Sequence, residues 1–138
     1  MKNEVFLDTA YAIALSSVRD SFHDKAVEIA HQLREENTKI VTTRAVLLEI
    51  GNALSKTRYR PAAVQLLNAI EYDPNIGIVP LTDSLYSQAF HLYQDRPDKE
   101  WGLVDCISFI VMQERDISHA LTTDDHFRQA GFTPLLQV

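Results

Sequence analysis

Four acidic residues of this chain lie in apolar surroundings, where a solvated surface acid would be out of place. They are Asp8, Glu49, Asp105 and Asp124. The first ends an apolar run, the second and third each lie within one, and the fourth follows the short run 120–122. Burying an ionised carboxylate without a partner is costly, so each of these acids needs a compensating group.

If the four carboxylates converge, their mutual repulsion makes the site unfavourable unless cations occupy it. A carboxylate cluster without thiols or paired histidines selects hard cations such as Mg²⁺ or Mn²⁺. The matching chemistry is metal-assisted hydrolysis, in which one ion acidifies its bound water and a second stabilises the leaving oxygen. We therefore interpret the four acids as metal ligands and catalytic groups.

Each acid also has a purely structural interpretation. Asp8 and Asp124 can cap the helices that are expected to follow them. Glu49 can reach solvent or Arg44, and Asp105 can be a first-turn acid favoured by the helix dipole. Periodicity alone does not show that the four side chains meet, so both interpretations stay open at this point.

The spacing of apolar residues predicts short strands that alternate with helices over a single domain, residues 1–138. We expect strands at 5–7, 39–42, 76–81, 120–122 and 135–138. We expect helices at 10–16, 21–36, 45–56, 61–72, 83–94, 103–114 and 124–130. This alternation favours an α/β fold with a parallel sheet covered on both faces. Ligands of such sheets bind at the carboxyl ends of the strands, which is where the acids are predicted.

The stretches that contain the acids have a recognisable order. They are 6–9, 48–54, 103–109 and 121–127. Together they resemble the four acidic motifs of PIN domains, in that family's order and spacing, over nearly the whole chain. The resemblance implies a three-layer α/β/α sandwich with a mainly parallel central sheet, and Mg²⁺- or Mn²⁺-dependent endoribonuclease activity on RNA. It also implies a VapC-type toxin that forms a homodimer and has a cognate antitoxin.

The sequence departs from the PIN pattern at one position. Many PIN domains carry a further Asp two residues after the fourth acid, where this chain has His126. Histidine is a less usual ligand for hard cations. We therefore expect His126 to pack or to contact phosphate rather than to bind metal, and the departure bears on a second metal site rather than on catalysis.

Other polar residues have secondary roles in this interpretation. Thr9 and Thr122 lie beside proposed ligands and can bond a carboxylate or a metal-bound water, while Asp98 can support the site from outside. The structural alternatives for the two threonines are a helix cap and a strand-end hydroxyl. The densest basic group brackets the Glu49 helix and can bind RNA phosphates or remain a solvated surface. It consists of Arg44, Lys56, Arg58 and Arg60.

Charge and composition limit the functional classes. The net charge of −6 does not favour nucleic acid, because phosphate contacts rest on Lys and Arg. Two bound dications would, however, more than neutralise the four carboxylates. The single cysteine, Cys106, excludes an internal disulfide. No apolar run approaches the ~18 residues of a membrane helix, and the N-terminal residues do not resemble a signal peptide, so we expect a cytoplasmic protein.

Two other functional classes remain open from the residues. A phosphoryl-accepting regulator or a phosphatase would use a strand-end Asp as nucleophile, but such phosphatases show Asp-x-Asp and here Asp8 is followed by Thr9 and Ala10. A non-catalytic binding module would use the acids as caps or ion-pair partners. That class predicts no binding of divalent cations.

Asp124 and the adjacent Asp125 cannot both point into one site if a helix begins here. Asp124 lies three residues before Phe127, which marks the apolar face of that helix. Asp125 lines up with Arg128 and Gln129 on the polar face. We therefore expect Asp124 at the site and Asp125 in solvent.

Overall fold

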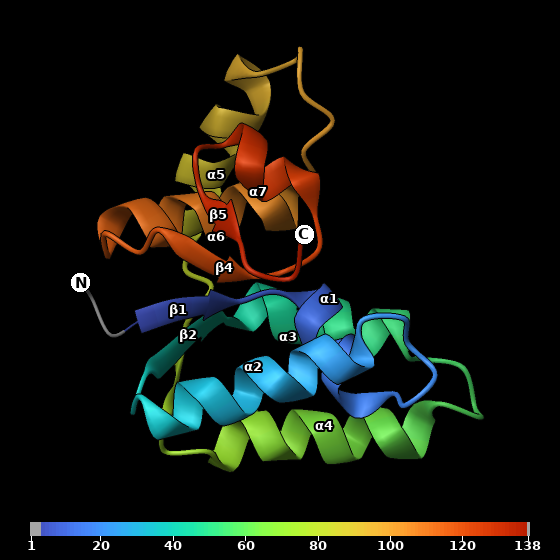
Figure 1. Ribbon diagram of the computed structural model, residues 1–138. Helices are drawn as coiled ribbons and strands as arrows, with labels where there is room; N and C mark the ends of the chain where they lie inside the picture. Colours follow the sequence, from blue (N-terminus) through green and yellow to red (C-terminus); the bar gives the residue numbers. More distant parts are fainter. Residues whose placement is uncertain (1–3, 138) are drawn as a thin grey trace.

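The computed structural model describes residues 4–137 as strands and helices that alternate along the chain (Figure 1). The strands are β1 (Glu4–Leu7), β2 (Lys39–Thr43), β3 (Ile76–Val79), β4 (His119–Leu121) and β5 (Thr133–Pro134). The helices are α1 (Thr9–Ser16), α2 (His23–Glu35), α3 (Arg44–Ala53), α4 (Arg60–Tyr72), α5 (Asp83–Asp95), α6 (Leu103–Glu114) and α7 (Asp125–Gln129).

The strands form one parallel sheet in the order β3-β2-β1-β4-β5. β1 lies at the centre, with Phe6 opposite Val41 of β2 on one side and Ala120 of β4 on the other. The short strand β5 forms one edge and contains Pro134, a residue that sheets tolerate at edges because it cannot donate to a ladder.

Helices cover both faces of the sheet. The chain proceeds outward from β1 through β2 to β3, then crosses back to β4 and continues outward to β5. Because crossovers between parallel strands are right-handed, this reversal moves the later helices to the opposite face. Figure 1 shows α5, α6 and α7 above the sheet and α1, α2 and α4 below it, while α3 packs against α1 and α4. The predicted three-layer α/β/α sandwich is confirmed.

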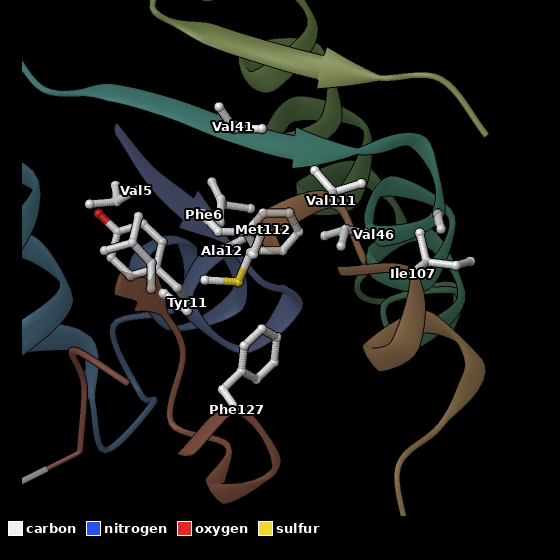
Figure 2. Close-up of a cluster of buried hydrophobic side chains, with 14 of the residues drawn as sticks. Val5, Phe6, Tyr11, Ala12, Val41, Val46, Ile107, Val111, Met112 and Phe127 are labelled. Carbon is white, nitrogen blue, oxygen red and sulfur yellow. The ribbon is translucent and has the colours of Figure 1, made fainter. Parts of the chain in front are cut away.

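The core lies on both faces of the central strand. Successive side chains of a strand point to opposite faces, so Phe6 faces α6 and α7, where its ring lies 6.4 Å from that of Phe127. The ring of Phe127 packs edge-on against Phe109 of α6 at 5.0 Å. Figure 2 shows Met112 within the same cluster. These contacts fix α6 and α7 against β1, the strand that Asp8 follows.

Element types agree with the sequence prediction, and the differences concern their ends. Helix α3 ends at Ala53 rather than at 56, so Lys56 lies in the following loop. The last strand is Thr133–Pro134 rather than 135–138; the backbone N–H groups of Leu135 and Leu136 still donate to β4 and to the residue after it. Val138 lies outside the described residues. Within residues 4–137, no helix is both long and apolar enough to cross a membrane.

Candidate active site

The sheet order reverses between β1 and β4, and at such a reversal open α/β sheets form a crevice at the carboxyl ends of the strands. The connections that leave these neighbouring strands lead to helices on opposite faces, α1 below and α7 above (Figure 1). A crevice of this kind is the usual ligand position in open α/β sheets. Asp8 directly follows β1, and Thr122 directly follows β4.

Asp8 is the most buried acid of the group, with 5% of its surface exposed. It occupies the N-cap position of α1, but its side chain makes no capping hydrogen bond. Instead, its Oδ2 accepts a hydrogen bond of 2.8 Å from the Thr122 hydroxyl. The capping interpretation of Asp8 is therefore wrong for the side chain, which points across the crevice towards β4.

Burial raises the pKa of Asp8 to about 7. The hydrogen bond from Thr122 lowers the pKa, while the negative charges of Asp105 and Glu49 raise it further. The three acids come from different elements: Asp8 follows β1, Glu49 lies on α3 and Asp105 on α6. An ionised Asp8 is thus unfavourable here unless a cation is supplied.

Thr122 connects the two strand-end acids. Its Oγ1 donates to Asp8 and accepts a hydrogen bond of 3.0 Å from the backbone N–H of Asp124. The residue is fully buried, and its backbone C=O accepts from Leu136. A hydroxyl is suited to this position because it can donate and accept at once.

Glu49 lies on α3, the helix that follows β2. In the sheet, β2 neighbours β1 on the side opposite β4. Thr43 caps this helix by accepting a hydrogen bond from the N–H of Val46. Glu49 lies between the exposed Leu48 and the buried Ile50, and its carboxylate accepts a hydrogen bond from the hydroxyl of Thr9. Thr9 and Thr122 therefore each hold one carboxylate of the cluster.

Asp105 lies in the first turn of α6, a helix whose next residues, 106–109, are buried. Its side chain is 15% exposed, and its Oδ2 accepts hydrogen bonds of 3.1 Å from the backbone N–H of Gly102 and from Nδ1 of His126. Burial raises the pKa of Asp105, and the charge of Asp124 adds to the effect. The sequence does not predict the hydrogen bond from Gly102 to Asp105, because every residue except proline has a backbone N–H.

Asp124 caps α7 by accepting a hydrogen bond of 2.9 Å from the backbone N–H of His126. The same Oδ1 lies 3.3 Å from Nδ1 of His126. Asp105, Asp124 and His126 each offer one ligand atom, and these atoms lie within 4.8 Å of one another. The structure therefore brings a histidine into the group, where the sequence suggested packing or a phosphate contact.

Asp125 points away from this group. Its carboxylate is 61% exposed, lies 3.5 Å from Nε of Arg128 and accepts a long hydrogen bond from Gln129. The geometry matches the predicted separation of the two adjacent acids, with Phe127 buried on the inner face of the helix.

Asp98 lies on the surface, outside the cluster. Its carboxylate accepts two hydrogen bonds of 3.0 Å from the guanidinium of Arg96. This local pair already compensates the charge of Asp98. The expectation that Asp98 supports the site stays a prediction. Trp101, in the same loop, is buried against Phe109 and donates to Gln129.

The basic residues near α3 have separate environments. Arg44 forms an ion pair with Glu71 of α4, and Arg60 donates to the backbone C=O of Ser55. The guanidinium of Arg58 lies over the ring of Tyr59, at 4.7 Å. Lys56 is exposed in the loop after α3.

The donor set fits a divalent cation. Asp105 and Asp124 lie together with His126, and Asp8 is linked to Asp124 through Thr122, whereas Glu49 is not part of that group and is bound by Thr9, the residue after Asp8. Burial raises the pKa of Asp8 and of Asp105. The arginines that form ion pairs do so with acids elsewhere: Glu71, Asp98, Glu4 and Asp125. Among residues 4–137, the hydrogen bonds and ion pairs to these acids come from neutral donors and from His126, so a bound cation would neutralise much of their charge.

Comparisons with known proteins agree with this geometry. A family model described as PIN domain matches residues 5–133. The chain is 28% identical over 128 residues to the 23S rRNA-specific endonuclease VapC20 of two Mycobacterium tuberculosis strains, covering 93% of this chain and 95% of that protein.

Two solved structures share the architecture. The crystal structure of Mycobacterium tuberculosis VapC20, described as a sarcin–ricin loop cleaving toxin, superposes with a TM-score of 0.84 at 27% identity, covering 94% of this chain and 96% of the other. VapBC2 from Rickettsia felis, bound to a fragment of its promoter DNA, gives a TM-score of 0.66 at 13% identity, covering 95% and 96%. The latter likeness concerns the fold alone.

Proposed function

The chain belongs to the PIN domain family, and we propose on this premise that it is a metal-dependent endoribonuclease acting as the toxin of a toxin–antitoxin pair. The observation that supports the proposal most directly is the carboxylate cluster at the crevice between β1 and β4. Asp8, Glu49, Asp105 and Asp124 would be the ligands and the catalytic groups. The alternatives of a phosphoryl-accepting regulator, a phosphatase or a binding module find no support in the family.

The acids would hold Mg²⁺ or Mn²⁺, which supplies an acidified water and neutralises charge on a phosphodiester. The protein's own part is to orient the carboxylates before the substrate arrives. Thr122 holds Asp8, Thr9 holds Glu49, and the N–H of Gly102 holds Asp105. Because each donor is fixed by the backbone of a regular element or its end, the ligands are preorganised.

Hydrolysis by water at phosphorus leaves a 5′-phosphate and a 3′-hydroxyl. Attack by the ribose 2′-hydroxyl would leave a 2′,3′-cyclic phosphate instead. The carboxylate site favours the first outcome because it is built to bind cations and water rather than to deprotonate a sugar hydroxyl. End-group analysis of the products separates the two routes.

RNA phosphates would be bound by the basic residues around the α3–α4 loop. Arg58 and Lys56 are exposed there and are the first candidates. Arg44 and Arg60 are partly engaged, by Glu71 and by the Ser55 carbonyl respectively, so their contribution would be smaller. Because the chain has a net charge of −6, most of its surface would repel RNA. This local basic group, together with a bound cation, would be the part that attracts RNA phosphates.

The proposed partners are a cognate antitoxin, with a basic side chain that enters the active-site groove, and a second copy of the chain. A homodimer is supported by the exposed aromatic face of α5, formed by Tyr86, Phe90 and Tyr93. Their rings stack in sequence, with centroids 6.2 and 6.4 Å apart. A contiguous apolar surface of this kind usually marks an interaction site.

Sedimentation at micromolar concentration tests the dimer. Phe90→Asp should convert a dimer to a monomer, whereas Tyr72→Asp, which changes an exposed aromatic residue of α4, should not. A wild-type protein that is strictly monomeric refutes the proposal.

The nuclease function is tested first on a synthetic sarcin–ricin loop RNA, the element cleaved by VapC20. We expect cleavage with Mg²⁺ or Mn²⁺, none in excess EDTA, and none by Asp8→Asn. A single-stranded RNA of unrelated sequence is the comparison substrate. Undiminished cleavage in excess chelator contradicts the metal-dependent mechanism.

A further inference from the structure

His126 occupies the position at which the outer carboxylates of the site converge. Its Nδ1 lies 3.1 Å from Oδ2 of Asp105 and 3.3 Å from Oδ1 of Asp124. The two acids come from different helices, α6 and the cap of α7, and the imidazole is directed between them. One ring nitrogen thus faces two anionic oxygens.

A hydrogen bond does not satisfy this arrangement fully. Nδ1 carries at most one proton, which can be directed well at only one of the two carboxylates. A divalent cation bound by all three atoms would instead satisfy both oxygens and the nitrogen lone pair. Ligands about 2.1 Å from an octahedral ion lie roughly 3.0 Å apart along an edge of the octahedron. The measured separations of 3.1 and 3.3 Å are close to that edge.

The imidazole is held in place by its surroundings. The backbone N–H of His126 donates to Asp124, and the backbone N–H of Asp124 donates to the buried Thr122. The next residue, Phe127, is fully buried against Phe6 and Phe109. The first turn of α7 is therefore fixed to the core, and its histidine is preorganised towards the acids. The side chain of His126 remains 30% exposed, so the group is accessible to solvent.

We propose that His126 is a nitrogen ligand of the divalent cation, and that it makes the site selective for Mn²⁺ over Mg²⁺. The inference rests on the metal-dependent nuclease proposed above and adds to it the identity of the ion. Both ions prefer oxygen ligands, but Mg²⁺ keeps much of its water, whereas Mn²⁺, a first-row transition ion, binds an imidazole nitrogen more strongly than Mg²⁺ does. Two carboxylates with one imidazole form a mixed oxygen–nitrogen set that ranks Mn²⁺ above Mg²⁺.

The first test is spectroscopic and does not depend on activity. Mn²⁺ is added below stoichiometry to the whole protein, and its electron spin echo envelope modulation is recorded. We expect a ¹⁴N modulation from a coordinated imidazole in the wild type. It should disappear in His126→Asp and in His126→Asn. His119→Asp is the matched control, because His119 begins β4, at the amino end of the strand and away from the acids at the carboxyl ends, and contacts Ser118. This variant should retain the modulation.

Calorimetry with each metal alone supplies the second readout. The ratio of the Mg²⁺ and Mn²⁺ dissociation constants should fall by about tenfold or more in His126→Asp, in the range typical when a group at a metal site is replaced. His126→Asn, which adds no charge, separates loss of the nitrogen from gain of an anion, and should lower the ratio as well. His119→Asp should leave it unchanged.

The possible results test the role of His126 separately from the proposed nuclease function. Bound Mn²⁺ without nitrogen modulation, or a metal ratio unaffected by both His126 variants, overturns the role of His126. If RNA cleavage still requires a divalent ion in that case, the nuclease proposal stands. Failure of the wild type to bind Mn²⁺ at all overturns both.

Discussion

The site has an inner and an outer end, and the carboxylates at the two ends differ in their burial and in their partners. The inner end is Asp8 with Thr122, at the junction of β1 and β4, where only 5% of Asp8 is exposed. The outer end is Asp124 with His126, at the start of α7, where the side chain of Asp124 is 35% exposed. The inner acid has a neutral hydroxyl as its partner, while the outer acid has solvent and an imidazole.

This difference indicates at which end of the site a bound cation would relieve the larger electrostatic cost. At the outer end, solvent and His126 can tolerate an ionised carboxylate. At the inner end, burial raises the pKa of Asp8 to about 7, so ionisation near neutral pH is unfavourable by itself. A cation bound next to Asp8 would favour ionisation of its carboxyl group, so the inner end gives the stronger reason to expect a metal requirement.

The largest effect is expected from Asp8→Asn. The variant should lose RNA cleavage by orders of magnitude, because the amide is a poorer ligand and carries no charge. Without metal, its melting temperature should be equal to or higher than that of the parent, because one of several neighbouring like charges has been removed. Single-turnover cleavage and thermal unfolding in EDTA measure the two quantities. A large loss of stability in the metal-free variant would show that Asp8 is mainly structural.

Asp124→Asn should also reduce cleavage by orders of magnitude, but with little change in melting temperature in either direction. Asparagine caps a helix about as well as aspartate, so the hydrogen bond from the His126 N–H can persist. The outer end gains less from the loss of charge because solvent already screens it. A melting temperature raised as much as in Asp8→Asn would remove the distinction between the two ends.

The pH dependence of metal-free stability provides a third test. The pKa of Asp8 rises from 3.8 in the unfolded chain to about 7 in the folded protein. The folded state therefore retains its proton to higher pH, and this stabilisation, complete below about pH 4, is lost as the pH rises to 7. The loss is at most about 4 kcal/mol, taking 1.36 kcal/mol for each pKa unit.

Urea unfolding in EDTA at pH 5 and pH 8 measures this change, and Asp8→Asn is its control because the amide does not titrate. We expect the parent to lose more stability than the variant between the two pH values. Parallel behaviour of the two proteins would show that another group dominates the titration.

The inner end could be predicted from the sequence more completely than the outer end. An acid at the end of an apolar run indicates the carboxyl edge of a buried strand, and this local signal located Asp8. The contact between Asp105 and His126 joins residues 21 positions apart on two helices. It depends on how Phe127 sets α7 against α6, which periodicity does not determine.

Two residues make local polar contacts that the sequence pattern does not indicate. Asp98 pairs with Arg96, which lies two residues away in the sequence, and this contact already compensates the charge of the Asp98 carboxylate. Lys56 was placed in a helix, but α3 ends at Ala53, before the loop in which the Ser55 carbonyl accepts from Arg60. In both cases a short-range polar contact is present, and the pattern of apolar residues contains no information about such contacts.

The smallest effect is expected from Asp125→Asn, which should stay within a few-fold of the parent in cleavage rate. Its carboxylate is directed to Arg128 and Gln129 on the solvent side of α7, opposite the buried Phe127. As an exposed first-turn acid it contributes at most ~0.3–1 kcal/mol through the helix dipole. Single-turnover cleavage of one labelled RNA by Asp125→Asn and Asp124→Asn, side by side, makes the comparison. An inactive Asp125→Asn beside an active Asp124→Asn would mean that α7 presents the other acid to the metal, and that the outer end of the site begins one residue later.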